Sequence, residues 1–350
     1  MDKIINALVL SPEQKEAFLA AAPGVEQVFL RDSDITAADL EGATVLLGNP
    51  SVAAVREGGT SLRWMHTRSA GADQYMPEGV LPAGAVLSSS VGAYGISVSE
   101  HMFAMLMALM KRLPDYRDNQ NAEIWKRTGT AKTLRGAKVL IGGAGDIGSS
   151  FALLCKAFGA ETLGIRRKVN KPAPGIDSMH SMDELDDLLA ECDVAALVFP
   201  RSPETDGLMS YERIKRMKPD AILINAGRGT AVDCKALARA LSEGHLFGAA
   251  LDVTDPEPLP AGHPLWKEKR ALITPHVAGG NSLEITAVKI GEIALENLRL
   301  YLDGQPVKNR LKYISTTQKP LAKSVRQRFF AWDRLREMGQ MAASRLQSLE

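Results

Sequence analysis

Short apolar runs alternate along the chain with stretches in which apolar residues recur every three or four positions. The first pattern indicates buried β-strands and the second indicates amphipathic helices. Strands that alternate with helices are typical of a parallel α/β sheet, so the sequence predicts an α/β protein. The predicted strands form two series: Asn6–Leu10, Val28–Leu30, Thr44–Gly48, Arg63–Thr67 and Ala85–Ser88, and then Lys138–Gly142, Thr162–Arg166, Val194–Phe199, Ala221–Asn225, Gly248–Val253 and Ala271–Thr274.

Segments with helical periodicity lie between the strands of the second series, and two further helical segments connect the two series. A long helix from Ser97 to about Lys111 joins them, and another from Leu283 to Tyr301 leads back. This order predicts a discontinuous first domain, residues 1–98 and 283–313, and a second domain at 99–282. Ligands are expected at the carboxyl ends of the second sheet's strands. Further helices are predicted at Ile147–Phe158, Met182–Ala190, Tyr211–Met217 and Cys234–Glu243.

Residues 314–350 have a different pattern, an apolar stripe at helical spacing opposite a basic face. We interpret this segment as an amphipathic C-terminal helical extension that docks on its own protein or on a partner subunit. A basic amphipathic helix lying on a membrane surface is the alternative. The apolar stripe comprises Leu321, Val325, Phe329, Trp332, Leu335, Ala342, Leu346 and Leu349, and the basic face comprises Lys323, Arg326, Arg328, Arg334, Arg336 and Arg345.

Composition narrows the functional classes. A chain of 350 residues can form two domains, and a net charge of +1 argues against a general nucleic-acid binder, which needs a broad basic surface. The three cysteines lie far apart in no zinc-binding or disulfide pattern, so no metal site is expected. The N-terminus does not resemble a signal peptide, and the longest apolar run, Met102–Met110, is too short to span a membrane. These features predict a soluble, cytoplasmic protein.

A glycine-rich loop follows the predicted strand Lys138–Gly142. Gly143 allows a tight turn, Gly145 lets the backbone approach a pyrophosphate, and Gly148 lets the helix pack closely on the strand. The N–H groups at the start of that helix then face the phosphates. The loop predicts a dinucleotide site, and a glycine turn without a ligand is the alternative.

The residue after the second strand of this unit bears on the choice of cofactor. Eighteen residues after Gly148, where an NAD site usually has an acidic residue, stands Arg166, followed by Arg167 and Lys168. A guanidinium binds the 2′-phosphate that a carboxylate would repel, so NADP(H) is favoured and NAD(H) stays possible. Solvated surface charges are the alternative, and Asp146 in the loop adds negative charge beside the pyrophosphate.

Three polar residues follow strands of the second series. Arg228 can hold a carboxylate with two hydrogen bonds and polarise a ketone. His276 can give or take a proton near neutral pH, and Glu257 can orient its ring. Each residue alone has an ordinary structural explanation, but together they predict reduction of a 2-oxo acid, with His276 as proton donor.

At these motifs the chain resembles the D-isomer-specific 2-hydroxyacid dehydrogenases, including the glyoxylate/hydroxypyruvate reductases, over residues 1–313. The resemblance implies a Rossmann-type doubly wound parallel sheet plus a smaller, discontinuous, flavodoxin-like α/β substrate domain. It also implies that Arg228, Glu257 and His276 are catalytic. The matching stretches are Val98–His101, Leu134–Gly148, Phe199–Thr205, Asn225–Gly229, Ala250–Val253, Glu257–Pro260 and Thr274–His276.

The same resemblance implies further contacts. The backbone N–H groups of Ala70 and Gly71 would hold the substrate carboxylate, and Asp252 would bind the nicotinamide carboxamide. Family members are usually homodimers that use the segment around 97–130, so a homodimer is expected. Arg166 departs from the family's pattern, which has an acidic residue there. From the motifs and the resemblance together, the expected cofactor contacts are Gly143, Gly145, Asp146, Ile147, Gly148, Arg166, Arg167, Pro200, Thr205, Ala226, Asp252 and Gly279.

Two functional hypotheses result. The first is an NAD(P)H-dependent reductase of a small 2-oxo acid such as glyoxylate, hydroxypyruvate or a short aliphatic 2-oxo acid, which would give a D-2-hydroxy acid. Arg68 and Tyr94 are candidates for contact with the far end of that substrate, or ordinary loop residues. The second hypothesis is a nucleotide-responsive, redox-sensing binding protein on the same fold. A protein that only senses a nucleotide does not need a proton donor, so the combination of Arg228, Glu257 and His276 favours the enzyme hypothesis.

Overall fold

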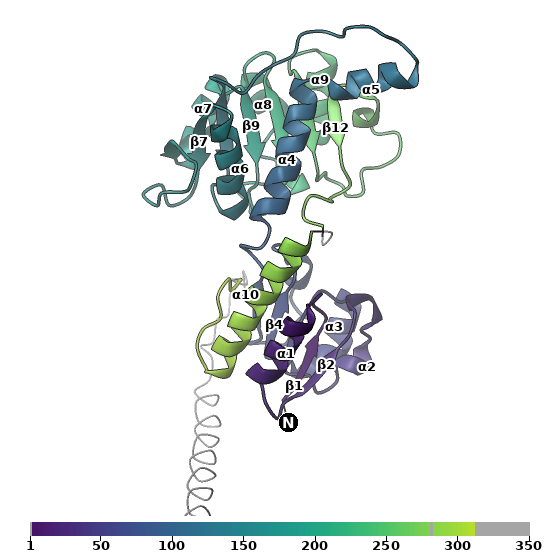
Figure 1. The fold of residues 1–350 in the computed structure, drawn as a ribbon, viewed down its shortest axis with the longest axis vertical. Helices are drawn as coiled ribbons and strands as arrows, with labels where there is room; N and C mark the ends of the chain where they lie inside the picture. The colour runs from purple at the N-terminus through teal and green to yellow at the C-terminus, as the bar shows by residue number, and fades with distance from the viewer. Residues whose placement is uncertain (1, 281–282, 312–350) are drawn as a thin grey trace, which may run out of the picture. The chain divides into compact units, whose positions relative to one another are not determined.

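The computed structural model describes residues 2–280 and 283–311, and the chain divides into two compact units (Figure 1). Of these described residues, unit 1 contains 2–91 and 287–311, and unit 2 contains 92–280 and 283–286. Each unit is built on one sheet whose strands all pair in parallel. The helical extension predicted at 314–350 lies outside the described residues.

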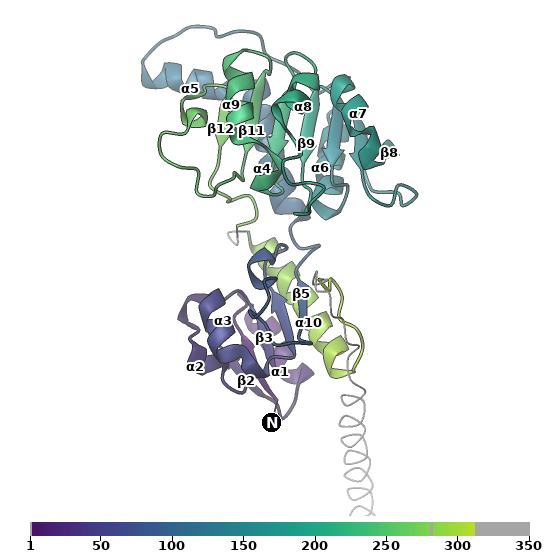
Figure 2. The same ribbon diagram turned by 180° about the vertical axis from the view of Figure 1, so that it is seen from behind.

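Unit 1 has a five-stranded sheet in the order β2-β1-β3-β4-β5, which is the flavodoxin-like order. Helices α1 and α10 cover one face and α2 and α3 the other (Figures 1 and 2). The amide of Gln14 in α1 donates to the carbonyl of Val288 in α10 at 2.9 Å, which ties the two helices together. The elements are β1 (Lys3–Asn6), α1 (Pro12–Ala21), β2 (Glu26–Phe29), α2 (Ala37–Leu40), β3 (Val45–Leu47), α3 (Val52–Gly58), β4 (Trp64–Thr67), β5 (Val86–Ser89) and α10 (Glu284–Leu302).

Unit 2 has a seven-stranded sheet in the order β12-β11-β10-β9-β6-β7-β8. Its strand order reverses between β6 and β9: β6, β7 and β8 proceed to one edge, and β9 to β12 proceed to the other. Helices α4 and α6 pack together on one face, and α7, α8 and α9 pack on the other (Figure 2). This is the doubly wound Rossmann-type arrangement. The elements are α4 (Gly95–Met110), α5 (Leu113–Asn121), β6 (Lys138–Gly142), α6 (Asp146–Ala157), β7 (Glu161–Ile165), β8 (Ser178–His180), α7 (Leu185–Glu191), β9 (Val194–Leu197), α8 (Tyr211–Arg216), β10 (Ile222–Asn225), α9 (Cys234–Ser242), β11 (Gly248–Leu251) and β12 (Ala271–Ile273).

The central strands of both sheets are buried on both faces. All residues of β3, β9, β10 and β11 are buried, because helices cover each side of the sheets. This explains why the strands appear in the sequence as continuous apolar runs rather than as alternating ones. The fold class predicted from the sequence, two parallel α/β sheets, is confirmed.

Two strands differ from the prediction. The first strand is Lys3–Asn6 and not Asn6–Leu10: the chain leaves the sheet after Asn6, Val9 is 62% exposed, and Ser11 caps α1. Strand β8 (Ser178–His180) was not predicted, because three half-buried, mostly polar residues carry no apolar signal. Its position at the edge of the sheet allows that composition.

A buried hydrogen-bonded chain runs through the core of unit 1. The Trp64 indole N–H donates to Ser88 Oγ (2.9 Å), and the Ser88 hydroxyl lies 2.8 Å from His66 Nδ1. On the other side of the ring, His66 Nε2 lies 3.0 Å from Ser90 Oγ, whose hydroxyl donates to the carbonyl of Thr67. Each hydroxyl has one proton, so the ring donates from Nε2 and accepts at Nδ1, as a neutral imidazole does. Burial lowers the pKa of His66 from 6.5 to about 4.

The pKa of His66 predicts a loss of stability in acid. The unfolded chain binds a proton at this residue below pH 6.5, whereas the folded protein binds it only near pH 4. Stability from His66 is therefore complete above pH 6.5 and falls to its minimum near pH 4, by about 3 kcal/mol in the free energy of unfolding. Urea unfolding of unit 1 at several pH values measures this loss. In a His66→Gln variant the free energy of unfolding should lack this part of the pH dependence. The same change in the free energy of unfolding with pH in both proteins would contradict the prediction.

Candidate active site

The glycine loop joins β6 to α6, and its three glycines have different surroundings. Gly143 has a φ of +101°, a conformation that favours glycine. A Cβ added at Gly148 would lie 2.3 Å from the carbonyl oxygen of Gly143, so only glycine lets the helix approach the loop this closely. A Cβ added at Gly145 would meet no atom within 4 Å. The space beside Gly145 is thus open to a ligand.

The first turn of α6 faces that space with uncapped amides. Gly145 is the N-cap residue and has no side chain to accept from the N–H groups of the turn that Asp146, Ile147 and Gly148 begin. Such an end attracts an anion. The Asp146 carboxylate is directed at Gly95, where an added Cβ would lie 2.6 Å from Asp146 Oδ1. These residues fit the pyrophosphate of a dinucleotide.

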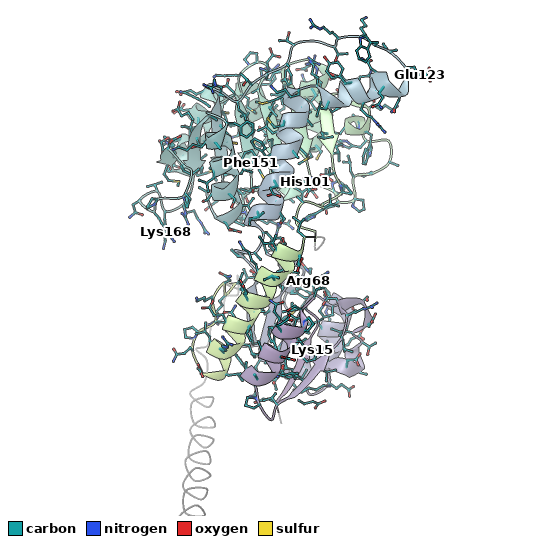
Figure 3. The ribbon with its side chains drawn as sticks, viewed as in Figure 1. Lys15, Arg68, His101, Glu123, Phe151 and Lys168 are labelled. Atoms are coloured by element: carbon teal, nitrogen blue, oxygen red, sulfur yellow. The ribbon has the colours of Figure 1, made fainter. Side chains whose placement is uncertain are left out.

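The basic residues after β7 lie beside the edge strand. Arg166 is half-buried, and its backbone N–H donates to the carbonyl of His180 in β8 at 3.1 Å. Arg167 and Lys168 are exposed on the loop that follows (Figure 3). In the described part of the chain, no acidic side chain pairs with any of these three cations. They are available to an anionic ligand.

The loop after β9 is closed by Thr205, which is 5% exposed. Its hydroxyl donates to the carbonyl of Pro200 at 2.9 Å, and Ser202 N–H donates to Thr205 Oγ1 at 2.9 Å. The ring of Phe199 lies against Gly142, where an added Cβ would be 2.4 Å from it. Pro200 and Thr205 therefore have a structural role in this loop in addition to the cofactor contact expected of them.

Arg228 is fixed by its neighbours at the end of β10. Asn225 is fully buried, donates to the Arg228 carbonyl at 2.9 Å and accepts from Gly227 N–H at 3.2 Å. Arg228 Nη1 donates to the carbonyl of Gly227 at 2.9 Å. A Cβ added at Gly229 would lie 1.8 Å from the carbonyl oxygen of Thr254, so the backbones touch. Ala226, just before this turn, is half-buried.

Glu257 and His276 meet although they lie on different loops. His276 Nδ1 is 2.7 Å from Glu257 Oε1, and the two side chains are 50% and 43% exposed. An ionised carboxylate only accepts, so Nδ1 carries the proton of this bond. Nε2 has no partner among the described residues and is available to a ligand.

The backbone of His276 is in the left-handed region, with a φ of +51°. Its N–H donates to the carbonyl of Asp252 at 2.8 Å. The Asp252 side chain, 2% exposed, accepts from the N–H groups of Val277 and Ala278 and from the hydroxyl of Thr274. Asp252 thus holds the His276 loop, a contact that the sequence analysis did not anticipate. The available signal was a polar residue at the end of an apolar strand.

The next residue of interest on this loop, Gly279, is half-buried, and an added Cβ would lie 3.3 Å from the ring of Tyr94. Among the described residues, no group of three or more His, Cys, Asp and Glu side chains is arranged to hold a metal ion. The helices among those residues include none long and apolar enough to cross a bilayer.

Ala70 and Gly71 lie in unit 1, whereas the other predicted site residues lie in unit 2. Both are half-buried on the loop that follows β4. Asn49 fixes this loop by accepting from Arg68 N–H at 2.8 Å and donating to Ser69 Oγ at 2.8 Å. Arg68 Nε lies 2.8 Å from Asp32 Oδ2 (Figure 3). The candidate substrate contact Arg68 is therefore engaged in an ion pair.

Comparison with known proteins identifies similar chains. A model of the NAD binding domain of D-isomer specific 2-hydroxyacid dehydrogenases matches residues 103–278. The glyoxylate reductase of Korarchaeum cryptofilum is 31% identical over 275 residues, which cover 76% of this chain and 81% of the relative. A D-isomer specific 2-hydroxyacid dehydrogenase from Xanthobacter autotrophicus, solved in complex with NADPH and MES, superimposes with a TM-score of 0.72 at 28% identity and covers 89% of this chain and 98% of its own.

Other relatives are longer. The D-3-phosphoglycerate dehydrogenase of Mycobacterium leprae is 33% identical over 288 residues, which cover 82% of this chain but 51% of the relative. The chain thus spans about half the length of the phosphoglycerate dehydrogenases that it matches.

The glycine loop generates a paired prediction. Gly145→Ala places a methyl group in open space, so the protein should fold normally but bind a nicotinamide dinucleotide at least tenfold more weakly. Gly148→Ala forces α6 away from Gly143, so it should lower stability by about 1–3 kcal/mol. Thermal unfolding and titration of the reduced cofactor by fluorescence measure the two effects. Wild-type affinity in Gly145→Ala would show that this space is not the phosphate site.

Proposed function

Because this chain belongs to the D-isomer specific 2-hydroxyacid dehydrogenase family, we propose that it reduces a small 2-oxo acid to a D-2-hydroxy acid with NAD(P)H. The observation that carries the proposal is the 2.7 Å contact between His276 Nδ1 and Glu257 Oε1. It leaves Nε2 available for proton transfer, at the same edge of the sheet as Arg228 and the glycine loop.

A bound nicotinamide dinucleotide supplies the hydride. The loop of Gly143, Gly145 and Gly148 and the first turn of α6 would hold its pyrophosphate. As hydride reaches the carbonyl carbon, His276 Nε2 delivers a proton to the carbonyl oxygen. Nδ1 keeps its proton throughout, and Glu257 accepts from it before and after the transfer. Glu257 thereby orients the ring and stabilises its charged form during the step.

Arg228 binds the substrate. A guanidinium can form two parallel hydrogen bonds with a carboxylate, and this fixes the plane of the adjacent ketone. The turn between Asn225 and Gly229 holds the Arg228 backbone, so little conformational freedom is lost when the substrate binds. The N–H groups of Ala70 and Gly71 in unit 1 are proposed to bind a substrate carboxylate.

The proposed cofactor is NADP(H). The support is Arg166, which stands at the carboxyl end of β7 and has no acidic partner among the described residues. The relative from Xanthobacter autotrophicus was solved with NADPH, which agrees with this choice. The proposed substrates are glyoxylate, hydroxypyruvate and short aliphatic 2-oxo acids, a choice that the similarity to a glyoxylate reductase supports.

A homodimer through the segment 97–130 is proposed as well. Leu113 (54%), Ile124 (51%) and Trp125 (105%) are exposed apolar side chains in this segment, and their burial against a second copy of the chain would favour association. Sedimentation equilibrium of the purified protein tests the assembly.

The proposed reaction can be followed as oxidation of NADPH or NADH at 340 nm. The substrates to compare are glyoxylate, hydroxypyruvate, pyruvate and longer or phosphorylated 2-oxo acids. We expect rapid turnover with a short acid and a kcat/KM for NADPH that exceeds that for NADH. A strong preference for NADH would remove Arg166 from cofactor selection. If the cofactor binds but no acid reacts, the redox-sensing protein becomes the better hypothesis.

His276→Ala should lower kcat by about 10²–10⁴-fold, because that is the usual contribution of a general acid. The Kd of NADPH should stay unchanged. His263→Ala is the control: His263 lies in the same unit and caps a short 3-10 helix, so its loss should leave kcat near the wild-type value. Full turnover in His276→Ala would exclude this residue as proton donor.

A further inference from the structure

We propose that His101 and Thr274 are positioning residues for His276 and that they act through the buried carboxylate of Asp252. This inference rests on the proposed function, in which His276 delivers the proton. None of the three supporting groups needs to touch the substrate to have this role. His101 lies on α4 (Figure 3), Thr274 follows β12 and Asp252 follows β11.

The hydrogen bonds of this network have a defined direction. The Thr274 hydroxyl donates its only proton to Asp252 Oδ1 at 2.7 Å. His101 Nε2 lies 3.0 Å from Thr274 Oγ1, so it must be the donor of that bond. His101 Nε2 is also 3.7 Å from Asp252 Oδ1. The geometry therefore places the proton of the imidazole on Nε2, directed at the carboxylate and the hydroxyl.

Asp252 connects these hydrogen bonds to the backbone of residues 276–278. Its backbone carbonyl accepts from His276 N–H at 2.8 Å, Oδ1 accepts from Val277 N–H at 2.9 Å, and Oδ2 accepts from Ala278 N–H at 3.1 Å. One residue thus holds three consecutive amides. A buried carboxylate requires such partners, so any movement of Asp252 would move the loop with it.

The loop needs this support because His276 adopts a left-handed backbone conformation, with a φ of +51°. For a residue other than glycine this conformation is sterically unfavourable. If Asp252 shifted, His276 could relax toward an ordinary conformation and its Nε2 would change position. A displacement of about 1 Å at a reacting group can lower a rate by about 10²-fold. His101 is well placed to prevent this, because it stands on a helix of 16 residues.

Thr274→Val tests the inference, because it keeps the side-chain volume and removes the hydroxyl. We expect kcat with the preferred 2-oxo acid to fall at least tenfold, while the Kd of NADPH changes less than twofold. Thr274→Ser restores the hydroxyl and should recover most of kcat. His101→Leu should behave as Thr274→Val does, and His101→Gln, which keeps an N–H donor, should recover part of the loss.

Thr162→Val is the matched control. Thr162 is fully buried in β7. Its hydroxyl lies 2.6 Å from the carbonyl oxygen of Gly175 and 3.0 Å from the carboxylate of Asp177, and it accepts from Asp177 N–H, so its loss removes comparable hydrogen bonds. A role in stability alone predicts that the Thr162 and Thr274 variants lose kcat equally or not at all. A positioning role predicts a loss only in Thr274→Val.

Hydrogen exchange supplies a readout that is independent of turnover. In Thr274→Val the amides of 276–278 should exchange at least tenfold faster than in the wild type, and in Thr162→Val they should not. Unchanged exchange would overturn the inference even in an active enzyme. Faster exchange with unchanged kcat would also overturn it, since the loop would then not control the step. A wild type inactive on every 2-oxo acid would instead refute the proposed function, and exchange would still test the network.

Discussion

Direct backbone-to-backbone contact at the carboxyl edge of the unit 2 sheet is the constraint on which the site depends. A Cβ added at Gly148, Gly227 or Gly229 would lie 1.8–2.8 Å from a carbonyl oxygen of a neighbouring segment. Since no side chain fits at these positions, three loops can converge on one edge. Gly145 differs, because its Cβ would enter open space, so packing does not require glycine there and the proposed pyrophosphate contact does.

The parallel sheet explains how residues far apart in sequence meet there. Every strand of unit 2 ends on the same edge, so the residues after β10, β11 and β12 become neighbours. Arg228, Asp252 and His276 each follow one of these strands. Glu257 reaches the group from the long loop between β11 and β12, and its contact with His276 joins two loops that the sheet alone would not fix.

Much of this arrangement could be predicted from the sequence. The apolar runs that form β9, β10 and β11 are buried on both faces and gave an unambiguous signal, and the family membership agrees with the motifs around Gly143 and His276. The polar strand β8 gave none, and the apolar residues around β1 predicted a strand with displaced bounds. Contacts between side chains and distant backbone could not be predicted either: no local pattern shows that Asp252 accepts from Val277 and Ala278 or that His101 reaches Thr274.

In the proposed site the reactive side chains are exposed, whereas the side chain that holds their loop is buried. Glu257 and His276 are about half exposed, which the proposed transfer of a proton to a substrate requires. Exposed pairs gain little from their mutual attraction, since water screens it, so their contact cannot hold the loop by itself. Asp252 beneath them is 2% exposed and fully engaged, and bonds to buried charged groups are stronger and less screened. The precise placement of the reactive imidazole is therefore a property of the buried layer, which a substitution can alter without contacting the substrate.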